Sequence, residues 1–459
     1  SGDRVETGEG RARARGMKTT LAAFQLREAH RKPFVLRGAR QVGKTTAVQI
    51  FGRQFRQFLS FNLERKEDRD LFDRDQPFDT LVKSLFFSRN RRVAGRSTLI
   101  FIDEIQNSER AVSALRYFYE EAPEIAVIAA GSLLEVMIDT YKSSFPVGRV
   151  EFAYMHPLTF REFLTATGES TALEGLDTVP LPDYAYTALR SLFHTYVLLG
   201  GMPEIIQRHV ERDDLSELSA IYESLMASYI DDAGKYAHGR SAFQVLRYTI
   251  ETAPLESGTR IQVQGFGNST YRSREIGEAL RTLERAMLLH LLYPVIGHEL
   301  PFLPNRKRSP RLQLLDVGLM NYRARLQAPL LEVTDLNDLY RGRITEQIVG
   351  QELLARSSRR LVPPIFRVRE KHQSQAEVDF VLPYNGRVIP IEVKSGSTGR
   401  LRSLHQYVAQ SGCTTAVRLY AGPLRLDSLT TPAGHPFRLL SLPYFLAAQV
   451  DRYLTWIEN

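Results

Sequence analysis

The chain has 459 residues, of which 43% are hydrophobic and 24% are charged. These values are typical of a globular protein with two or three domains that each bury a core. No stretch approaches the roughly 18 consecutive apolar residues that a membrane-spanning helix needs, so we expect no membrane partner. Cys413 is the only cysteine, which excludes an intramolecular disulfide and a cysteine-rich zinc site and predicts a cytoplasmic location.

The formal net charge is +8 at pH 7, from 60 Lys and Arg against 52 Asp and Glu. This balance makes nucleic acid, DNA in particular, a candidate partner, because Lys and Arg that neutralise phosphates provide most non-specific affinity. Solvated surface charge is the alternative, and net charge alone favours it.

Residues 1–16 lack an apolar run and are interpreted as an appended tag or a disordered tail. A helix is predicted over residues 19–30. Residues 17–156 then alternate amphipathic stretches with short apolar runs, which predicts an α/β fold with a parallel sheet wrapped by helices. The runs lie at residues 33–37, 58–63, 98–103, 125–131 and 150–155.

Helical periodicity replaces this alternation from residue 157. We expect a helical lid over residues 157–235, with helices at 186–199 and 215–230 separated by a break at Gly200 and Gly201. Residues 236–325 are predicted to form a winged-helix-like connector, with one amphipathic helix over 273–292 and strands at 289–295 and 311–315. Its basic residues could enter a DNA groove, or the helix could pack beside the lid; they are Arg272, Arg274, Arg281 and Arg285.

The last segment, residues 326–459, has the pattern of a separate α/β domain. Helices are predicted at residues 343–356 and 401–410. Strands are predicted at residues 366–369, 376–382, 388–393 and 415–420.

A phosphate-binding loop is predicted directly after the first strand. The residues match the Walker A pattern and are Gly38, Ala39, Arg40, Gln41, Val42, Gly43, Lys44 and Thr45, followed by Thr46. A strand feeds this loop and a helix follows it, so backbone N–H groups would converge on the phosphates of ATP at a helix N-terminus. Lys44 would reach the β- and γ-phosphates, and the hydroxyl of Thr45 would bind Mg²⁺.

A buried strand that ends in Asp103 and Glu104 has the Walker B arrangement. Asp103 would orient the magnesium shell, and Glu104 would polarise the attacking water. Arg149 could act in trans on the transition-state charge of a neighbouring subunit, or it could cap a turn as an exposed residue. Ser132 could sense the γ-phosphate, although serine after a strand more often caps a helix.

A second candidate site lies in the last segment, where two strands join through Asn385 and Gly386. Strand alternation places Glu392 and Lys394 on one face, opposite Asp379. Asp379 and Glu392 could hold magnesium, and Lys394 could orient or deprotonate a water for phosphodiester hydrolysis. A cross-strand salt bridge without catalysis is the alternative.

Several runs together resemble the bacterial and archaeal AAA-plus ATPases that carry a C-terminal domain of unknown function: VLRGARQVGKTT, IFIDEIQ, AAGSLLE, VGRVEFAYMHPLTFREFL and GGMPE. The resemblance implies an ATP-binding module, a helical lid, a winged-helix-like connector, a homo-oligomer, and a terminal domain similar to the PD-(D/E)xK nucleases. Glu346 matches the acidic residue that often completes the nuclease pattern, and Gln406 could support it. Residues 129–132 depart from other AAA-plus proteins because they lack a polar Asn or Thr just before this point.

Three functions are compatible with these patterns. The first is a Mg²⁺-dependent ATPase whose nucleotide cycle controls a DNA-directed C-terminal domain. The second is an ATP-regulated, metal-dependent nuclease. The third is a nucleotide-gated protein-interaction switch that holds ATP without turning it over.

Overall fold

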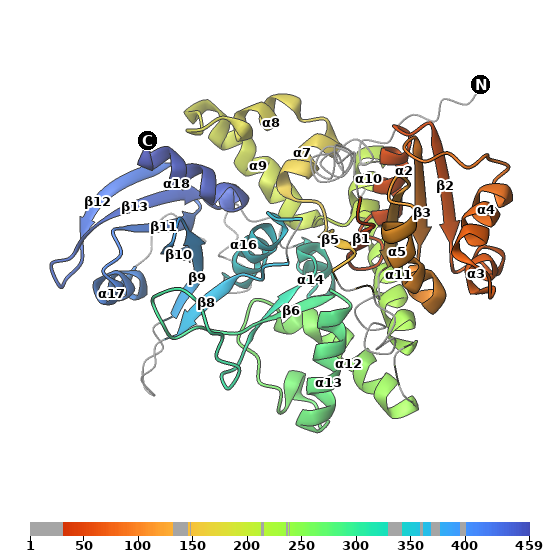
Figure 1. Ribbon diagram of the computed structural model, residues 1–459. Helices are drawn as coiled ribbons and strands as arrows, with labels where there is room; N and C mark the ends of the chain where they lie inside the picture. Colours follow the sequence, from red (N-terminus) through yellow and green to blue (C-terminus); the bar gives the residue numbers. More distant parts are fainter. Residues whose placement is uncertain are drawn as a thin grey trace. The chain divides into compact units, whose positions relative to one another are not determined.

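The computed structural model describes residues 31–131, 146, 148–212, 215–235, 237, 239–328, 342–358, 361–368, 377–394 and 401–459 (Figure 1). The chain divides into two units. The first contains the described residues up to His156 together with short segments at 285–287 and 357–361, and the second contains the rest. The predicted tail and the helix expected over residues 19–30 lie outside the described residues.

A five-stranded sheet forms the centre of the described part of the first unit, in the order β2-β3-β4-β1-β5 (Figure 1). Every neighbouring pair is parallel, so the predicted parallel α/β fold is confirmed. Each predicted strand agrees with the structure to within one residue at either end. The strands are β1 (Phe34–Arg37), β2 (Gln57–Asn62), β3 (Thr98–Asp103), β4 (Ala126–Gly131) and β5 (Glu151–Tyr154).

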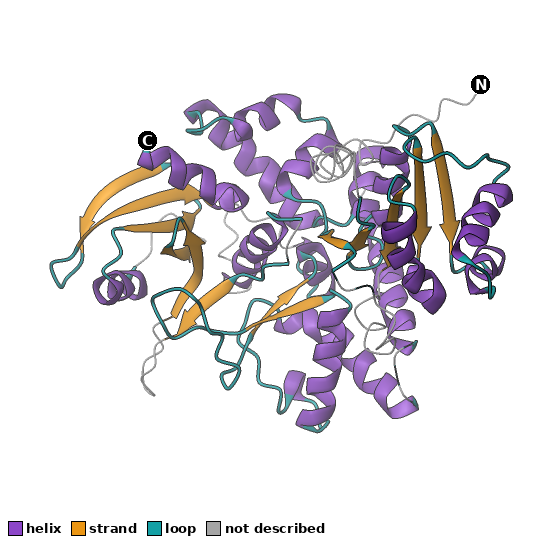
Figure 2. Cartoon of the chain, viewed as in Figure 1, coloured by secondary structure: helices purple, strands orange, loops and turns teal. Residues whose placement is uncertain are grey.

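Helices connect these strands and pack around the sheet (Figure 2). They are α2 (Lys44–Gly52), α3 (Lys66–Asp73), α4 (Phe78–Ser88) and α5 (Glu109–Glu121), with the short helix η1 (Ile105–Asn107). Strands β3 and β4 are buried at every position, as the apolar sequence of both strands requires. Phe61, Ile100 and Phe118 belong to the core between the sheet and these helices.

The register of the sheet determines where the phosphate-binding loop lies. Arg37, the last residue of β1, pairs with Gly131 at the end of β4, and Asn62 pairs with Asp103 at the end of β3. The loop after β1 and the acidic pair after β3 therefore emerge at the same carboxyl edge of the sheet, where ligands bind in open α/β sheets.

The second unit begins with a set of helices that covers the predicted lid and connector. They are α7 (Phe160–Thr167), α8 (Ser170–Asp177), α9 (Asp183–Leu199), α10 (Pro203–Arg212), α11 (Leu215–Gly234), α12 (Arg240–Glu256), η2 (Phe266–Asn268), α13 (Ser273–Arg285) and α14 (Val317–Arg323). The predicted continuation of the α13 helix to residue 292 is wrong. Met287 has a left-handed φ of 59°, and Leu289–Leu292 form strand β6, which pairs antiparallel with β7 (Arg311–Leu314).

The described C-terminal residues form a mixed six-stranded sheet in the order β12-β13-β11-β10-β9-β8. Its strands are β8 (Ile365–Val368), β9 (Glu377–Tyr384), β10 (Arg387–Lys394), β11 (Thr415–Tyr420), β12 (Arg425–Thr430) and β13 (Pro436–Pro443). The helices are α16 (Arg343–Ala355), α17 (Arg402–Ser411), η5 (Tyr444–Gln449) and α18 (Val450–Glu458). Asn385 and Gly386 both have positive φ, at 47° and 75°, so they form the tight β9–β10 turn that the sequence predicts.

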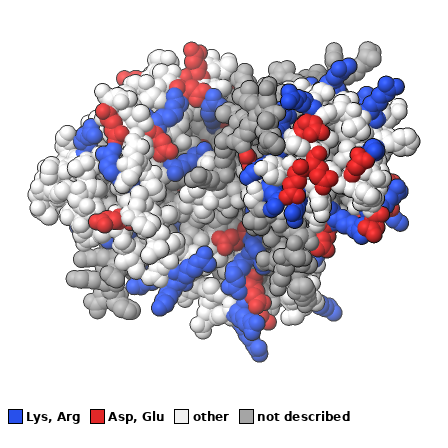
Figure 3. Space-filling view, viewed as in Figure 1, with Lys and Arg blue, Asp and Glu red and all other residues white. Residues whose placement is uncertain are grey.

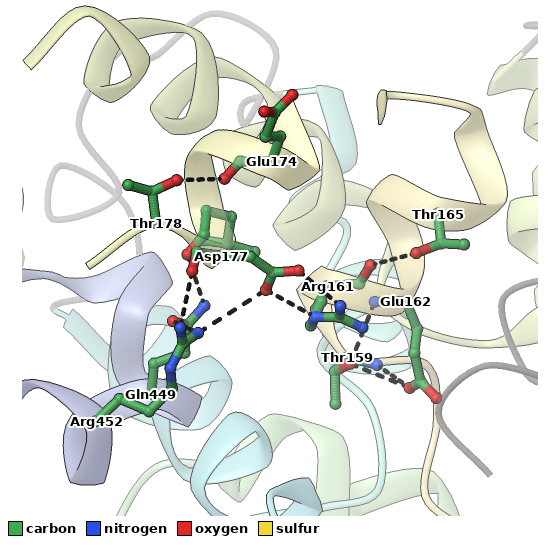
Figure 4. Close-up of polar contacts among 10 residues, drawn as sticks. Thr159, Arg161, Glu162, Thr165, Glu174, Asp177, Thr178, Gln449 and Arg452 are labelled. Carbon is green, nitrogen blue, oxygen red and sulfur yellow. Dashed lines mark hydrogen bonds and ion pairs between the residues drawn. The ribbon is translucent and has the colours of Figure 1, made fainter. Parts of the chain in front are cut away.

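Polar contacts join the first helices of the second unit to its last (Figure 4). Arg161 on α7 donates to both carboxylate oxygens of Asp177 at the end of α8, at 2.9 and 2.6 Å. Arg452 on α18 donates to the backbone oxygen of Asp177 at 2.7 Å, and Gln449 donates to the backbone oxygen of Leu176 at 3.1 Å. The segments predicted as lid and terminal domain are thus tied together within one unit.

Among the helices that the structure describes, we find none of sufficient length and apolar character to span a lipid bilayer.

Candidate nucleotide site and C-terminal acidic cluster

The loop between β1 and α2 depends on two glycines. A Cβ atom at Gly38 would lie 2.4 Å from the backbone oxygen of Met155, so only glycine fits there without a backbone shift. Gly43, which precedes the first residue of α2, has a left-handed φ of 87°, and Gln41 has one of 61°. The loop is therefore a tight turn that ends at a helix N-terminus, which is the geometry that binds phosphate groups.

Lys44 is the first residue of α2, and its side chain lies against this loop. Its Nζ donates to the backbone oxygens of Gly38 at 2.9 Å and Ala39 at 2.8 Å. The side chain is buried, with 6% of its surface exposed. The ammonium group thus lies where the phosphates of a nucleotide in the loop would meet it.

Thr45 and Asp103 meet at the carboxyl edge of the sheet. The hydroxyl of Thr45 donates to Oδ2 of Asp103 at 2.7 Å, and Oδ1 accepts from the backbone N–H of Glu104 at 3.1 Å. Burial raises the pKa of Asp103, while the bond from Thr45 acts in the opposite direction. A hydroxyl beside a buried carboxylate supplies the hard oxygen donors that Mg²⁺ prefers, so these residues fit a magnesium ion.

Glu104 occupies a left-handed backbone conformation, with φ of 51° and ψ of 46°. This conformation is uncommon for a residue with a side chain and occurs often at functional sites. Oε2 of Glu104 accepts from Nε2 of Gln106 at 2.5 Å. Gln106 was not singled out by the sequence analysis, although it stands two residues after Glu104 in the same motif.

Arg149 lies at the amino end of the strands, whereas the phosphate-binding loop follows the carboxyl end of β1. It precedes β5, and the first residue of β5 pairs with Phe34 at the start of β1. The guanidinium forms an ion pair with Glu120 at the end of α5, and this hydrogen bond is the main cause of the lowered pKa of Glu120. Arg149 therefore lies away from the phosphate-binding loop of its own chain. Ser132 lies outside the described residues.

The structure brings together the four residues of the second candidate site. Lys394 contacts Oε1 of Glu392 at 2.7 Å, and Oδ2 of Asp379 accepts from the backbone N–H of Val393 at 2.8 Å. Burial and the charge of Asp379 are the larger causes of the raised pKa of Glu392, and Glu346 on α16 lies close enough to add to them. We refer to Glu346, Glu377, Asp379 and Glu392 as the acidic cluster. Gln406 is exposed on α17.

Arg311 at the start of β7 also belongs to this site, and the sequence analysis did not predict it. One nitrogen contacts Oε2 of Glu346 at 3.2 Å, and the other forms an ion pair with Glu377 and lies 3.8 Å from Oδ1 of Asp379. The guanidinium also lies over the ring of Phe366, 4.7 Å from its centroid. Burial lowers the pKa of Arg311, but the carboxylates outweigh it and raise that pKa above its usual value.

These contacts do not fit a magnesium ion in the acidic cluster. Burial is the main cause that raises the pKa of Glu346 to about 7 and that of Glu392 to about 8, and the neighbouring carboxylate of Asp379 adds to both shifts. Arg311 already supplies a positive charge to Glu346, Glu377 and Asp379. Within the described residues, no three His, Cys, Asp or Glu side chains are arranged to hold a metal ion.

Three domain families match the sequence. An AAA domain matches residues 30–164, and two domains of unknown function match residues 190–330 (DUF8612) and 341–429 (DUF4143). The chain therefore carries an AAA-type P-loop ATPase domain. The family that matches the terminal segment has no described activity, so its likeness to nucleases rests on the motif alone. No curated protein matches the chain.

Solved structures that are similar to the chain include three ATPase-type proteins. A Walker-type ATPase of Pyrococcus abyssi is 12% identical, with a TM-score of 0.42 over 68% of this chain and 94% of that chain. The RuvB Holliday junction branch migration motor of Thermotoga maritima is 15% identical, with a TM-score of 0.29 over 65% and 92%. The ORC2 protein of Aeropyrum pernix is 14% identical, with a TM-score of 0.27 over 72% and 96%. Such low scores carry no argument about this chain's activity or partners.

Proposed function

We propose that this chain is a Mg²⁺-dependent ATPase whose nucleotide cycle controls a DNA-directed C-terminal part. The observation that carries the proposal is the 2.7 Å contact between the Thr45 hydroxyl and Asp103, beside a glycine-turned loop that holds Lys44. A triphosphate on this loop would meet the ammonium of Lys44 and a metal held by Thr45 and Asp103.

Each residue then has a distinct role in hydrolysis. The backbone N–H groups of residues 38–46 bind the phosphates, and Lys44 exchanges its contacts with the oxygens of Gly38 and Ala39 for contacts with the β- and γ-phosphates. Thr45 and Asp103 would hold Mg²⁺, which would neutralise charge on the phosphate oxygens. Glu104 polarises the attacking water, and Gln106 orients the Glu104 carboxylate through its 2.5 Å hydrogen bond.

ATP hydrolysis by purified variants tests this proposal. We expect Lys44→Ala to lose nucleotide binding and turnover, whereas Glu104→Gln retains binding and loses turnover by about 100-fold or more, the loss typical of a general base. Lys83→Ala is the matched control, because Lys83 is an exposed lysine that pairs with Asp79 on α4. Unchanged hydrolysis in Lys44→Ala contradicts the proposal. Tight nucleotide binding by the wild type with negligible turnover favours the interaction switch.

The basic face around α13 supports the DNA-directed part of the proposal. Arg272, Arg274 and Arg281 are exposed on or beside α13, and Arg306 is exposed in the loop between β6 and β7. Arg306 lies over the ring of Tyr293 at 5.5 Å, and both Arg306 and Arg281 lower the otherwise raised pKa of Tyr293. The helix and the loop therefore present positive charge to one region, in the order of elements expected for a winged helix.

This face is not purely basic. Figure 3 shows Lys and Arg side chains interleaved with acidic ones over the lower part of the view, where Figure 1 places α13. Arg274, for example, pairs with Glu278 at 3.3 Å. A few phosphate contacts, rather than a long basic track, are therefore expected.

Binding of a fluorescent DNA duplex across a salt series tests the face directly. Log affinity falls with log salt, and each lost phosphate contact makes this slope less steep by about 0.9. We therefore expect Arg281→Ala/Arg306→Ala to make the slope less steep by about 2. Arg110→Ala, which removes an exposed arginine on α5, serves as the control. The absence of binding by the wild type at low salt contradicts the DNA-directed part and leaves the ATPase part standing.

A homo-oligomer is the third part of the proposal, because Arg149 could reach only the nucleotide of a neighbouring subunit. Its ion pair with Glu120 would have to open first. Light scattering with and without ATP, on wild type and Glu104→Gln, tests this part. A strict monomer in every state contradicts an action of Arg149 in trans.

A further inference from the structure

The acidic cluster contains one buried oxygen atom without a partner. Glu392 is 4% exposed, and among the described residues its Oε2 has no hydrogen-bond partner, while Oε1 contacts Lys394. A buried carboxylate oxygen left unpaired is costly, and it usually marks a ligand or an alternative conformation. Asp379 and Glu346 lie close enough to this carboxylate to raise its pKa, in addition to burial.

Arg311 supplies the positive charge that contacts the other three carboxylates of the acidic cluster. It is 4% exposed, and its two terminal nitrogens contact Glu346, Glu377 and Asp379. One of these nitrogens also donates to the backbone oxygen of Asp379 at 3.1 Å. Strand β7 contributes this side chain, whereas the carboxylates come from α16 and β9.

We propose that Arg311 is an internal counter-ion that takes the place of a divalent cation in the acidic cluster and excludes one in this conformation. The guanidinium donates a hydrogen bond to Glu377, pairs with Glu346 at 3.2 Å and lies 3.8 Å from Oδ1 of Asp379, so a bare ion cannot take these carboxylates without breaking a buried ion pair. Within the described residues, Glu392 is the one member of the cluster with a fully buried oxygen that lacks a partner, and a single carboxylate oxygen does not bind a divalent ion strongly.

The position of Arg311 identifies the element that controls the site. Arg311 is the first residue of β7 and pairs with Leu292 of β6, so it follows any movement of this hairpin. The loop that joins the two strands carries Arg306 and Lys307, which are exposed. A ligand that draws the β6–β7 hairpin away from β9 would withdraw Arg311 and leave the acidic cluster open to a cation.

Removal of the guanidinium should therefore create a cation site. We suggest titrating Mn²⁺ into the full chain without nucleotide and following free Mn²⁺ by electron paramagnetic resonance. Wild type and Glu392→Gln are expected to bind equally, because the cluster is closed. Arg311→Met is expected to bind one further Mn²⁺ per chain at least tenfold more tightly than wild type, and Arg311→Met/Glu392→Gln is expected to lose it.

The matched control is Arg274→Met, which removes an exposed arginine on α13 and should leave Mn²⁺ binding unchanged. A wild-type chain that already binds the Glu392-dependent ion overturns the proposal, and so does an Arg311→Met variant that folds and gains none. Folding of every variant is followed by the fluorescence of Trp456, the single tryptophan of the chain.

A second variant decides the question if Arg311→Met does not fold. Arg311→Gln removes the positive charge that excludes the cation and keeps an amide that can donate to the carboxylates, so this change is milder. We expect a several-fold gain in Mn²⁺ affinity, and no gain overturns the proposal. No nucleotide is present in these titrations, so their outcome is independent of whether the chain hydrolyses ATP.

Discussion

Glu352 on α16 carries a carboxylate whose ionisation opposes folding of the second unit. It is 2% exposed and accepts hydrogen bonds from the backbone N–H of Phe160 at 2.9 Å and the hydroxyl of Tyr196 at 2.8 Å. Burial raises the pKa of Glu352 to about 7, although these two bonds act in the opposite direction. Because this value exceeds the usual 4.5, the folded chain holds the proton more tightly than the unfolded chain.

The stabilisation from protonated Glu352 is therefore complete below about pH 4.5 and is lost as the pH rises through about 7. At about 1.4 kcal/mol for each pH unit between these values, ionisation costs roughly 3 kcal/mol at pH 8. Glu352→Gln keeps an acceptor oxygen and cannot ionise. We expect the variant to lose about 3 kcal/mol less stability than wild type between pH 4.5 and pH 8.

Urea denaturation at these two pH values measures the difference. Trp456 on α18 is the only tryptophan and lies in the second unit, so its fluorescence reports unfolding of this unit. Asp316, whose pKa burial raises to about 6, contributes in the same direction in both proteins and cancels in the comparison. Glu211→Gln, an exposed change on α10, is the control. The same loss of stability in wild type and Glu352→Gln would refute the reasoning.

Three further changes have defined outcomes. Gly38→Ala should abolish ATP binding, because the added Cβ would lie 2.4 Å from the Met155 oxygen, and calorimetric titration with ATP would detect the loss. Arg311→Met should lower the free energy of unfolding by about 3–5 kcal/mol, since it leaves buried carboxylates uncompensated, and urea denaturation measures this. Gly386→Ala should cost roughly 1 kcal/mol in the same assay, because φ is 75° there and the added methyl group meets no neighbouring atom.

The nucleotide site was predictable because its signals are local. The glycines of the loop, Lys44 and Thr45 lie within eight consecutive positions, and the apolar strand before Asp103 fixes the edge at which the two motifs meet. The β9–β10 hairpin was predictable for the same reason, since Asn385 and Gly386 suit a two-residue turn with positive φ.

The contacts that sequence reasoning missed are those between distant residues. Arg311 lies 66 positions from Glu377, in a segment predicted as the connector, and no periodic pattern marks it as a partner of the terminal segment. Strand β12 also escaped prediction, because it has no strictly buried position and is defined by its pairing with β13. The end of α13 was misplaced because Met287, rather than a glycine, adopts the left-handed conformation there.

Calorimetric titration of ATP into the wild-type chain, with Mg²⁺ and with a chelator, tests the central claim most directly. If the loop after β1 holds the nucleotide, and Thr45 and Asp103 hold its metal, one ATP should bind per chain with saturation. This binding should weaken when Mg²⁺ is removed and disappear in Lys44→Ala. Binding that is the same in wild type and Lys44→Ala would contradict the account.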